Sequence, residues 1–244
     1  MAKAKWRTLY RAGAVAPLIA LALYFSQFII MALGEPFPAT AVEWFALFQR
    51  NKLLGLWYLN ALDIISFTLV GIMFLALYAA LRHVSPSWML IAVYVALLGV
   101  VVFVVPRVLT LSMLPLSDLH AAAPTEAEKA TYLAAGETLS NVTTATPQTV
   151  GFQLTAVAGL IISAAILPSR DFAGSATLGR AAGILGIVGF CVALANYVCR
   201  IVAPPLAAIL MPISGLLWLV WWLTMSIGLF RQSRCASSQE AVSA

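Results

Sequence analysis

The longest apolar segment of this chain carries a carboxylate inside it. The segment Leu53–Leu81 reads LLGLWYLNALDIISFTLVGIMFLALYAAL, and Asp63 is its one charged residue. A charged side chain at the centre of a bilayer costs about 2.5–3.5 kcal/mol even on the lenient insertion scale. Asp63 must therefore face protein or water, find a partner on another helix, or stay protonated.

The composition places the whole chain in a membrane. Hydrophobic residues make up 62% of the 244 residues, charged residues only 9%, and the mean hydropathy is +0.97. In soluble domains, about a quarter of the residues are charged. We therefore predict a multi-pass membrane protein whose single membrane domain covers residues 1–244, with no soluble domain of ordinary size.

Six apolar segments are long enough to span a membrane as helices, which takes about 20 residues each. Pro204 and Pro205 separate the last two, because a helix cannot continue through them without losing hydrogen bonds. The fold class predicted is thus all-α, a polytopic bundle of six spans, with a disordered polar tail at 232–244. The predicted spans are Ala12–Leu33, Leu53–Leu81, Trp88–Leu114, Val150–Leu167, Ala181–Ala203 and Leu206–Phe230.

Lys and Arg residues predict the orientation, because they collect in short cytoplasmic loops. With a cytoplasmic N-terminus, the inner side holds nine of the fourteen basic residues and the outer side only five. Ala12–Leu33 is too long for a cleaved signal peptide and is expected to be a retained span. We predict a bacterial inner (plasma) membrane protein with both termini in the cytoplasm.

Both long outer connections contain a helix-start signature. Thr40 and Glu43 form a capping-box pattern before Trp44, and Thr125 and Glu128 form another. In this pattern the hydroxyl and carboxylate satisfy free backbone donors at a helix start. We predict a short interfacial helix in the first connection and, in the second, a capping helix from Glu126 to about Leu139.

The polar residues inside the spans are the candidate ligand-binding residues. Counted from Leu53, Asp63 lies about 15 Å deep and near the midplane. Arg107 and Arg200, near the outer ends of their predicted helices, are long enough to bend inward toward it. The full candidate set is Asn60, Asp63, Arg107, Gln153, Asn196 and Arg200.

This set supports more than one interpretation. In one, an outward-opening cavity uses the two guanidiniums to bind or transport a small amphiphile or anion, while Asp63 tunes them or carries a proton. In another, the chain is a structural or accessory subunit whose polar core only fixes helix order, with the arginines reaching lipid phosphates. For Asn196 and Gln153 taken alone, hydrogen bonding between helices is favoured. A membrane enzyme acting on a lipid is the least favoured alternative.

Other chemistry has no recognisable pattern in the sequence. His83 and His120 fall on opposite sides of the membrane and cannot share a metal. Ser214 lies in an Ile-Ser-Gly context, but the glycine expected before it is Pro212 and no predicted span contains a histidine base. The basic residues form no patch with interleaved aromatics, which argues against nucleic acid. We predict no metal, no cofactor and no catalytic residue, and membrane lipids as partners.

Three segments resemble a family of uncharacterised bacterial multi-pass membrane proteins, found especially in actinobacteria and grouped as a domain of unknown function. They are ALYAALRHVSPS at 76–87, LSDLHAAA at 116–123 and TEAEKATYLAAG at 125–136. The resemblance implies a helical integral membrane protein and carries no activity with it. His120 departs from the Gln-Tyr-like residues of that loop in the family.

Overall fold

The six-span helical bundle is confirmed. The computed structural model describes residues 6–34, 36–59, 61–144, 146–169, 172 and 175–243, and the regular structure in these residues is helical, without strands. Six of its helices are long and apolar enough to cross a membrane, so the chain is a multi-pass membrane protein. They are α1 (Arg7–Leu33), α4 (Leu62–Leu81), α5 (Pro86–Thr110), α8 (Thr146–Ile166), α9 (Ala176–Val202) and α10 (Pro204–Ser243).

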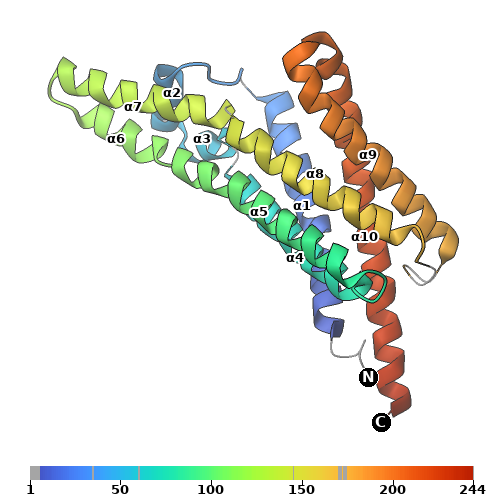
Figure 1. Cartoon of the computed structure of the whole chain (residues 1–244). Coiled ribbons are helices and arrows are strands. Elements are labelled where there is room, and N and C mark those ends of the chain that lie inside the picture. Colours follow the sequence, from blue (N-terminus) through green and yellow to red (C-terminus); the bar gives the residue numbers. More distant parts are fainter. Residues whose placement is uncertain are drawn as a thin grey trace.

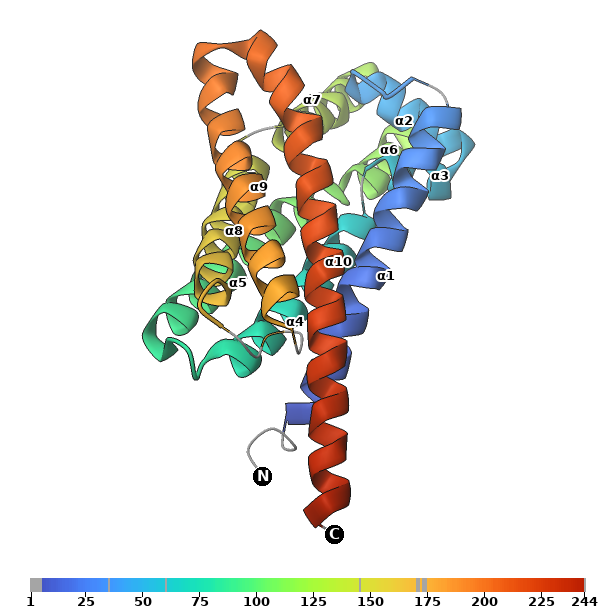
Figure 2. The same cartoon turned by 90° about the vertical axis from the view of Figure 1, so that its right-hand side faces the viewer.

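Four further helices fill the two long connections and lie together at one end of the bundle (Figures 1 and 2). We call them the cap: α2 (Ala41–Arg50), α3 (Lys52–Tyr58), α6 (Met113–Ala122) and α7 (Glu126–Thr144). Helix α1 begins and α10 ends at the opposite end of the bundle (Figure 1). Cap and chain ends thus lie on opposite sides, and which side is cytoplasmic stays a prediction.

The cap helices begin where local side chains satisfy their free backbone donors. Thr40 Oγ1 accepts from Glu43 N at 3.3 Å, and Glu43 Oε2 accepts from Ala39 N at 2.6 Å. Thr125 Oγ1 accepts from Glu128 N at 3.2 Å. Both predicted helices in the long connections are confirmed, although α7 runs on to Thr144, beyond the predicted Leu139.

The cap has an apolar core of its own, separate from that of the bundle. Phe37, on the connection after α1, meets the Trp44 ring edge-on at 5.1 Å between centroids. Helix α7 is tied on by the Ala41 backbone N–H, which donates to Glu137 Oε1 at 2.8 Å. The buried residues of this core are Trp44, Phe45, Leu47, Phe48, Tyr58, Leu59 and Met113.

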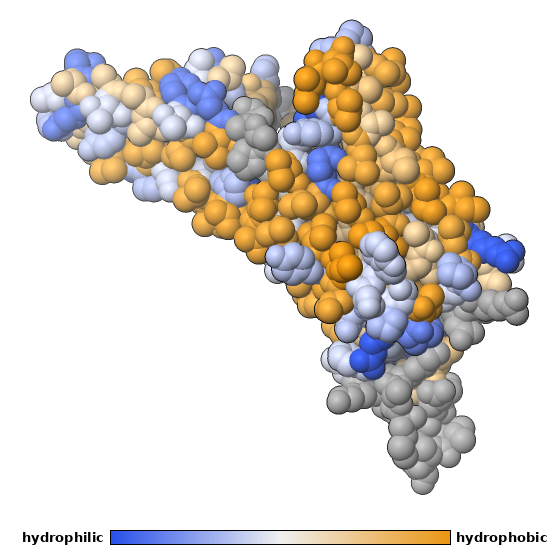
Figure 3. Space-filling model, in the orientation of Figure 1, coloured by the Kyte–Doolittle hydropathy of each residue, from blue (hydrophilic) through white to orange (hydrophobic). Residues whose placement is uncertain are grey.

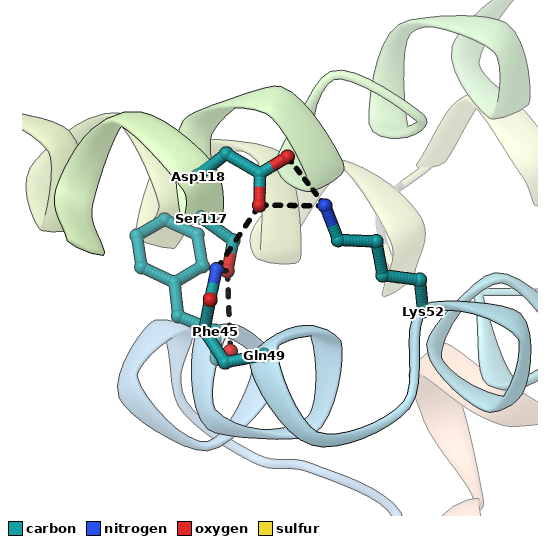
Figure 4. Close-up of polar contacts among 5 residues, drawn as sticks. All are labelled: Phe45, Gln49, Lys52, Ser117 and Asp118. Carbon is teal, nitrogen blue, oxygen red and sulfur yellow. Dashed lines mark hydrogen bonds and ion pairs between the residues drawn. The ribbon is translucent and has the colours of Figure 1, made fainter. Parts of the chain in front are cut away.

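A polar network holds α6 onto α2 and α3 (Figure 4). Gln49 Nε2 donates to Ser117 Oγ at 3.0 Å and to Asp118 Oδ1 at 3.1 Å, and Lys52 Nζ lies 2.8 Å from Asp118 Oδ2. Ser117 Oγ donates in turn to the Phe45 carbonyl at 3.1 Å. Three of the four cap helices are therefore cross-linked at their exposed edge.

In the bundle, small residues let helices approach closely. A Cβ on Gly186 of α9 would overlap the Ser163 hydroxyl on α8 and lie 2.5 Å from Trp221 Nε1 on α10. Gly186, Ala193 and Asn196 are all buried on α9, as their shared helix face predicts. Apolar side chains cover the middle of the face in Figure 3, as expected for a surface in contact with lipid.

The predicted span 53–81 is interrupted. Helix α3 ends at Tyr58, α4 begins at Leu62, and the Ala61 N–H donates to the Leu56 carbonyl, five residues back, at 3.1 Å. Helix α4 alone is about 30 Å long, enough for the hydrocarbon core. Asp63 lies in its first turn and hence at the cap end of the span, so the expected depth near the midplane is wrong.

Two other boundaries differ from those predicted. The span 88–114 ends earlier, at Thr110, and a turn at Leu111 and Ser112 leads into α6. Where the composition predicted a disordered tail, α10 continues as helix through Ser243. Ser233 and Ala236 in this extension are buried, so packing sustains a segment whose sequence is polar and small.

Candidate functional site

Asp63 and Arg107 form an ion pair between α4 and α5. Arg107 Nη2 lies 3.4 Å from Asp63 Oδ2, and the two residues are only 4% and 6% exposed. The expectation that Asp63 finds a guanidinium partner on another span is met by Arg107. The pair lies at the cap end of the bundle, where α4 begins and α5 ends.

Local helix chemistry favours each charge where it lies. Asp63 is in the first turn of α4, where the helix dipole stabilises a negative charge. Arg107 is in the last turn of α5, where the dipole stabilises a positive one, and it follows Pro106, which loosens the backbone. Thr110 Oγ1 donates to the Arg107 carbonyl at 2.8 Å and satisfies one of the helix-end acceptors.

Helix α1 adds two polar side chains that sequence reasoning missed. The Gln27 amide faces the Asp63 carboxylate, although its Nε2 makes no hydrogen bond of ordinary geometry. Tyr24 lies close enough to interact electrostatically with both Asp63 and Arg107. Gln27 could have been found from the sequence, because it is an amide within the apolar segment 12–33. Placing such a polar group in lipid costs free energy, so it is expected to face protein.

An aromatic layer underlies the charged pair. The Arg107 guanidinium carbon lies 5.4 Å from the centroid of the Phe103 ring, a cation–π distance. Phe103 stacks on Phe67 and meets Phe152 of α8 edge-on, at 5.0 Å between centroids. Phe152 in turn contacts Trp218 of α10. These rings separate the polar cluster from the rest of the bundle core.

Several polar atoms at the ion pair and on the helices that contribute the aromatic layer are buried and have no hydrogen-bond partner among the described residues. Each such atom costs about 1–3 kcal/mol, so native proteins rarely leave several together. Most of them are donors, and three lie at the ion pair itself. The atoms are Tyr24 OH, Gln27 Nε2, Ser66 Oγ, Arg107 Nε, Gln153 Oε1 and Trp218 Nε1. The cluster thus offers more donors than it uses.

The other predicted residues do not all join this cluster. Asn196 Nδ2 donates to the Ala207 carbonyl at 2.7 Å and closes the α9–α10 hairpin. Arg200 is exposed at the end of α9, with Nη2 3.6 Å from Met211 Sδ. The structure therefore does not bring this second guanidinium to Asp63, because α9 packs on α8 and α10. Asn60 lies outside the described residues.

Gln153 occupies an intermediate position. It is partly buried on α8 and follows Phe152 of the aromatic layer in the sequence. Its Oε1 is a buried acceptor with no hydrogen-bond partner in the part of the chain that the structure describes. Among the residues that the structure describes, no group of three or more His, Cys, Asp or Glu side chains lies close enough to hold a metal.

No family model, curated protein sequence or solved structure matches this chain. The resemblance of segments 76–87, 116–123 and 125–136 to a bacterial family therefore stays a prediction. The broader class rests on the six apolar helices, which make this chain a multi-pass membrane protein.

Proposed function

We propose that this chain is a non-enzymatic protein of a bacterial inner membrane that binds a small amphiphile, whose polar group lies at the Asp63–Arg107 cluster. With both termini in the cytoplasm, the cap and this cluster face the outer side. The observation that carries the proposal is a set of buried donors around the ion pair that have no hydrogen-bond partner among the described residues: Arg107 Nε, Gln27 Nε2 and Tyr24 OH.

The charge of the cluster favours an uncharged polar group over an anion. Arg107 already faces Asp63 at 3.4 Å, so their charges offset each other. An anion would have to compete with Asp63 for the guanidinium in a region of low dielectric constant. An ester carbonyl or hydroxyl oxygen accepts hydrogen bonds without adding charge, and it matches the donors available.

The lipid side of α1 supports an amphiphile with an acyl chain. Phe25 and Phe28 are 57% and 60% exposed, and they flank Tyr24 and Gln27 on the same helix. One side of helix α1 thus faces the polar cluster, and its other side faces lipid. An acyl chain lying along these exposed rings would leave the attached polar group within reach of Gln27.

Thermal unfolding of the detergent-solubilised protein with added lipid tests the proposal. Dioleoylglycerol, which is neutral, should raise the unfolding temperature, whereas dioleoyl phosphatidic acid should raise it less. A ligand at 100 times its Kd stabilises by about 2.7 kcal/mol. Gln27→Leu should abolish the shift, and the control Arg180→Gln, exposed at the other end of the bundle, should keep it. An equal shift in wild type and Gln27→Leu would contradict the proposal.

A structural role of the polar core is the second candidate, and one observation favours it. The same ion pair joins the α3–α4 break to the α5–α6 turn, and Asn196 closes the α9–α10 hairpin. Replacing a buried ion pair by apolar residues of similar volume is often neutral for stability. Asp63→Leu with Arg107→Met should therefore fold under both candidates, and should lose the dioleoylglycerol shift only under the first.

A further inference from the structure

The aromatic layer beside the ion pair fills the middle of a ring of helices. Each of the six spans packs mainly on two others, in the order α1, α4, α5, α8, α9, α10 and back to α1. Two ring contacts cross the interior of this arrangement. Phe67 of α4 meets Phe152 of α8 edge-on, and Phe152 meets Trp218 of α10 in the same way. The layer is therefore enclosed by helices.

Side chains of α10 and α1 continue this layer and lead back to the ion pair. Trp218 contacts Trp222, with 6.4 Å between the ring centroids. Trp222 in turn contacts Tyr24 of α1, with 5.9 Å between the centroids. Tyr24 interacts electrostatically with both Asp63 and Arg107. The layer, which begins at Arg107, thus closes into a circuit of contacts that ends at the same ion pair.

Four polar atoms of this circuit have no hydrogen-bond partner within the described ranges, and all four are able to donate. Indole and guanidinium N–H groups donate and cannot accept, whereas a phenol does both. All four atoms are buried, and Arg107 and Trp222 are each only 4% exposed. The atoms are Arg107 Nε, Trp218 Nε1, Trp222 Nε1 and Tyr24 OH. A ligand that satisfies them presents acceptors and brings no donors of its own.

We infer that the amphiphile is a quinone with an apolar tail, an inference that rests on the proposed function and names its class of ligand. A quinone ring is flat and uncharged, and its two carbonyl groups accept hydrogen bonds and donate none. The flat ring suits a site built largely from aromatic side chains. One carbonyl accepts from Arg107 or Tyr24, and the other accepts from the indoles of α10. A diacylglycerol matches less well, because its hydroxyl also donates.

The lipid side of α1 and α10 accommodates the tail. Phe25, which follows Tyr24 on α1, is 57% exposed, and Leu223, which follows Trp222 on α10, is 43% exposed. Helices α1 and α10 are neighbours in the ring, so these exposed residues lie one position from the two side chains that meet between the helices. A tail that leaves the ring at this contact enters lipid directly.

Thermal unfolding of the full chain in detergent, titrated with decylubiquinone and with its reduced form decylubiquinol, tests this inference. The quinol has the same ring and tail, but its two hydroxyl protons meet a site that consists mainly of donors. The quinone should bind about tenfold more tightly, because a buried donor without an acceptor costs about that factor in Kd. Equal or tighter binding of the quinol by wild type would overturn the inference.

Two neighbouring tryptophans provide a matched pair of variants. Trp222→Phe removes one donor of the circuit and keeps a ring beside Tyr24, so it should weaken binding of the quinone about tenfold. Trp221→Phe removes an indole N–H that lies against Gly186 on α9, outside the circuit, and should leave quinone binding unchanged. Each variant is compared with its own unfolding temperature without ligand. Equal effects of the two substitutions on quinone binding would overturn the inference.

Dioleoylglycerol separates failure of this inference from failure of the proposed function. A larger shift of the unfolding temperature with decylubiquinone than with dioleoylglycerol, at equal concentration, supports the quinone. A shift with dioleoylglycerol that equals or exceeds the shift with decylubiquinone would overturn the quinone and leave the amphiphile site standing. No shift with either compound would contradict both.

Discussion

Asp63 and Arg107, whose charged groups lie 3.4 Å apart, join two places where the chain leaves the bundle for the cap. Asp63 is the second residue of α4, directly after the break that follows α3. Arg107 is in the last turn of α5, just before the turn into α6. A single buried ion pair therefore joins two of the connections between the spans and the cap, α3–α4 and α5–α6.

Removing one member of this ion pair should lower the free energy of unfolding substantially. Asp63→Asn or Arg107→Gln removes one charge and, in the first case, leaves a guanidinium buried without its counter-charge. Breaking a buried pair in this way costs about 3–5 kcal/mol. Chemical unfolding in micelles should show this loss for Asp63→Asn and its recovery in the Asp63→Leu, Arg107→Met double variant. A loss below about 1 kcal/mol, as at exposed pairs, would show that the charges are solvated.

The sequence predicts that Asp63 needs a partner on another helix, but it does not predict where along the helices the pair lies. An acidic residue in an apolar span requires a partner, and Arg107 was one of two candidates. Sequence distance alone could not show that α9 packs on α8 and α10, which leaves Arg200 outside the cluster. The depth of Asp63 was wrong because residues 59–61 carry no proline or glycine to mark the break.

In the cap, too, features that depend on neighbouring residues in the sequence are predicted, whereas features that depend on tertiary packing are not. Helices α2 and α7 were predicted because Thr40 and Thr125 act within their own first turns. Helix α6 was not predicted, and Pro115 lies in its first turn, where a helix tolerates proline. A cavity lined by Phe37, Ala46 and Leu54 forms where three segments of the chain meet, so no local sequence pattern predicts it.

Two glycine variants should behave oppositely. Alanine at Gly186 would place its methyl group against the Ser163 hydroxyl and the Trp221 ring, and overpacking of this kind costs about 1–3 kcal/mol. At Gly215 a Cβ meets nothing within 4 Å, so Gly215→Ala should be neutral or stabilising by up to about 1 kcal/mol. Thermal unfolding in one detergent compares the two. Equal effects would mean that α8, α9 and α10 pack less closely than described.

Asn196 should matter for the hairpin and not for the ligand. Asn196→Leu removes the 2.7 Å hydrogen bond to the Ala207 carbonyl. Hydrogen bonds between membrane helices contribute about 0.6 kcal/mol on average and at most about 1.7. We expect a loss in that range, measured by unfolding, with the dioleoylglycerol shift preserved. Loss of that shift would place Asn196 in the binding site after all.

The cap carries a carboxylate whose titration can be followed. The Lys129 ammonium, 2.8 Å from Glu126 Oε1, lowers the pKa of that carboxyl below its ordinary value of 4.5. The pair therefore contributes at pH values above 4.5, and its contribution is lost as the pH falls through the lowered pKa. NMR titration of ¹³C-labelled glutamate should show the pKa of Glu126 rising in Lys129→Gln. An unchanged pKa would mean that the pair does not persist in solution.

The orientation predicts which cysteines a membrane-impermeant maleimide can reach in intact cells. Cys235, exposed on the extension of α10, should react only after lysis, in a variant that lacks the other two cysteines. In a cysteine-free variant, Glu128→Cys on the cap should react without lysis, because the proposed orientation places the cap on the outer side. The opposite pattern would invert the membrane orientation and leave the fold unchanged.

A high-resolution density map of the protein in lipid nanodiscs would show directly whether an amphiphile binds at the Asp63–Arg107 cluster. We expect non-protein density with a polar end about 2.7–3.2 Å from Arg107 Nε or Gln27 Nε2, continuing as an acyl chain beside Phe25 and Phe28. A map in which these donors bond only to protein atoms, or in which Asp63 faces lipid tails away from Arg107, would contradict it.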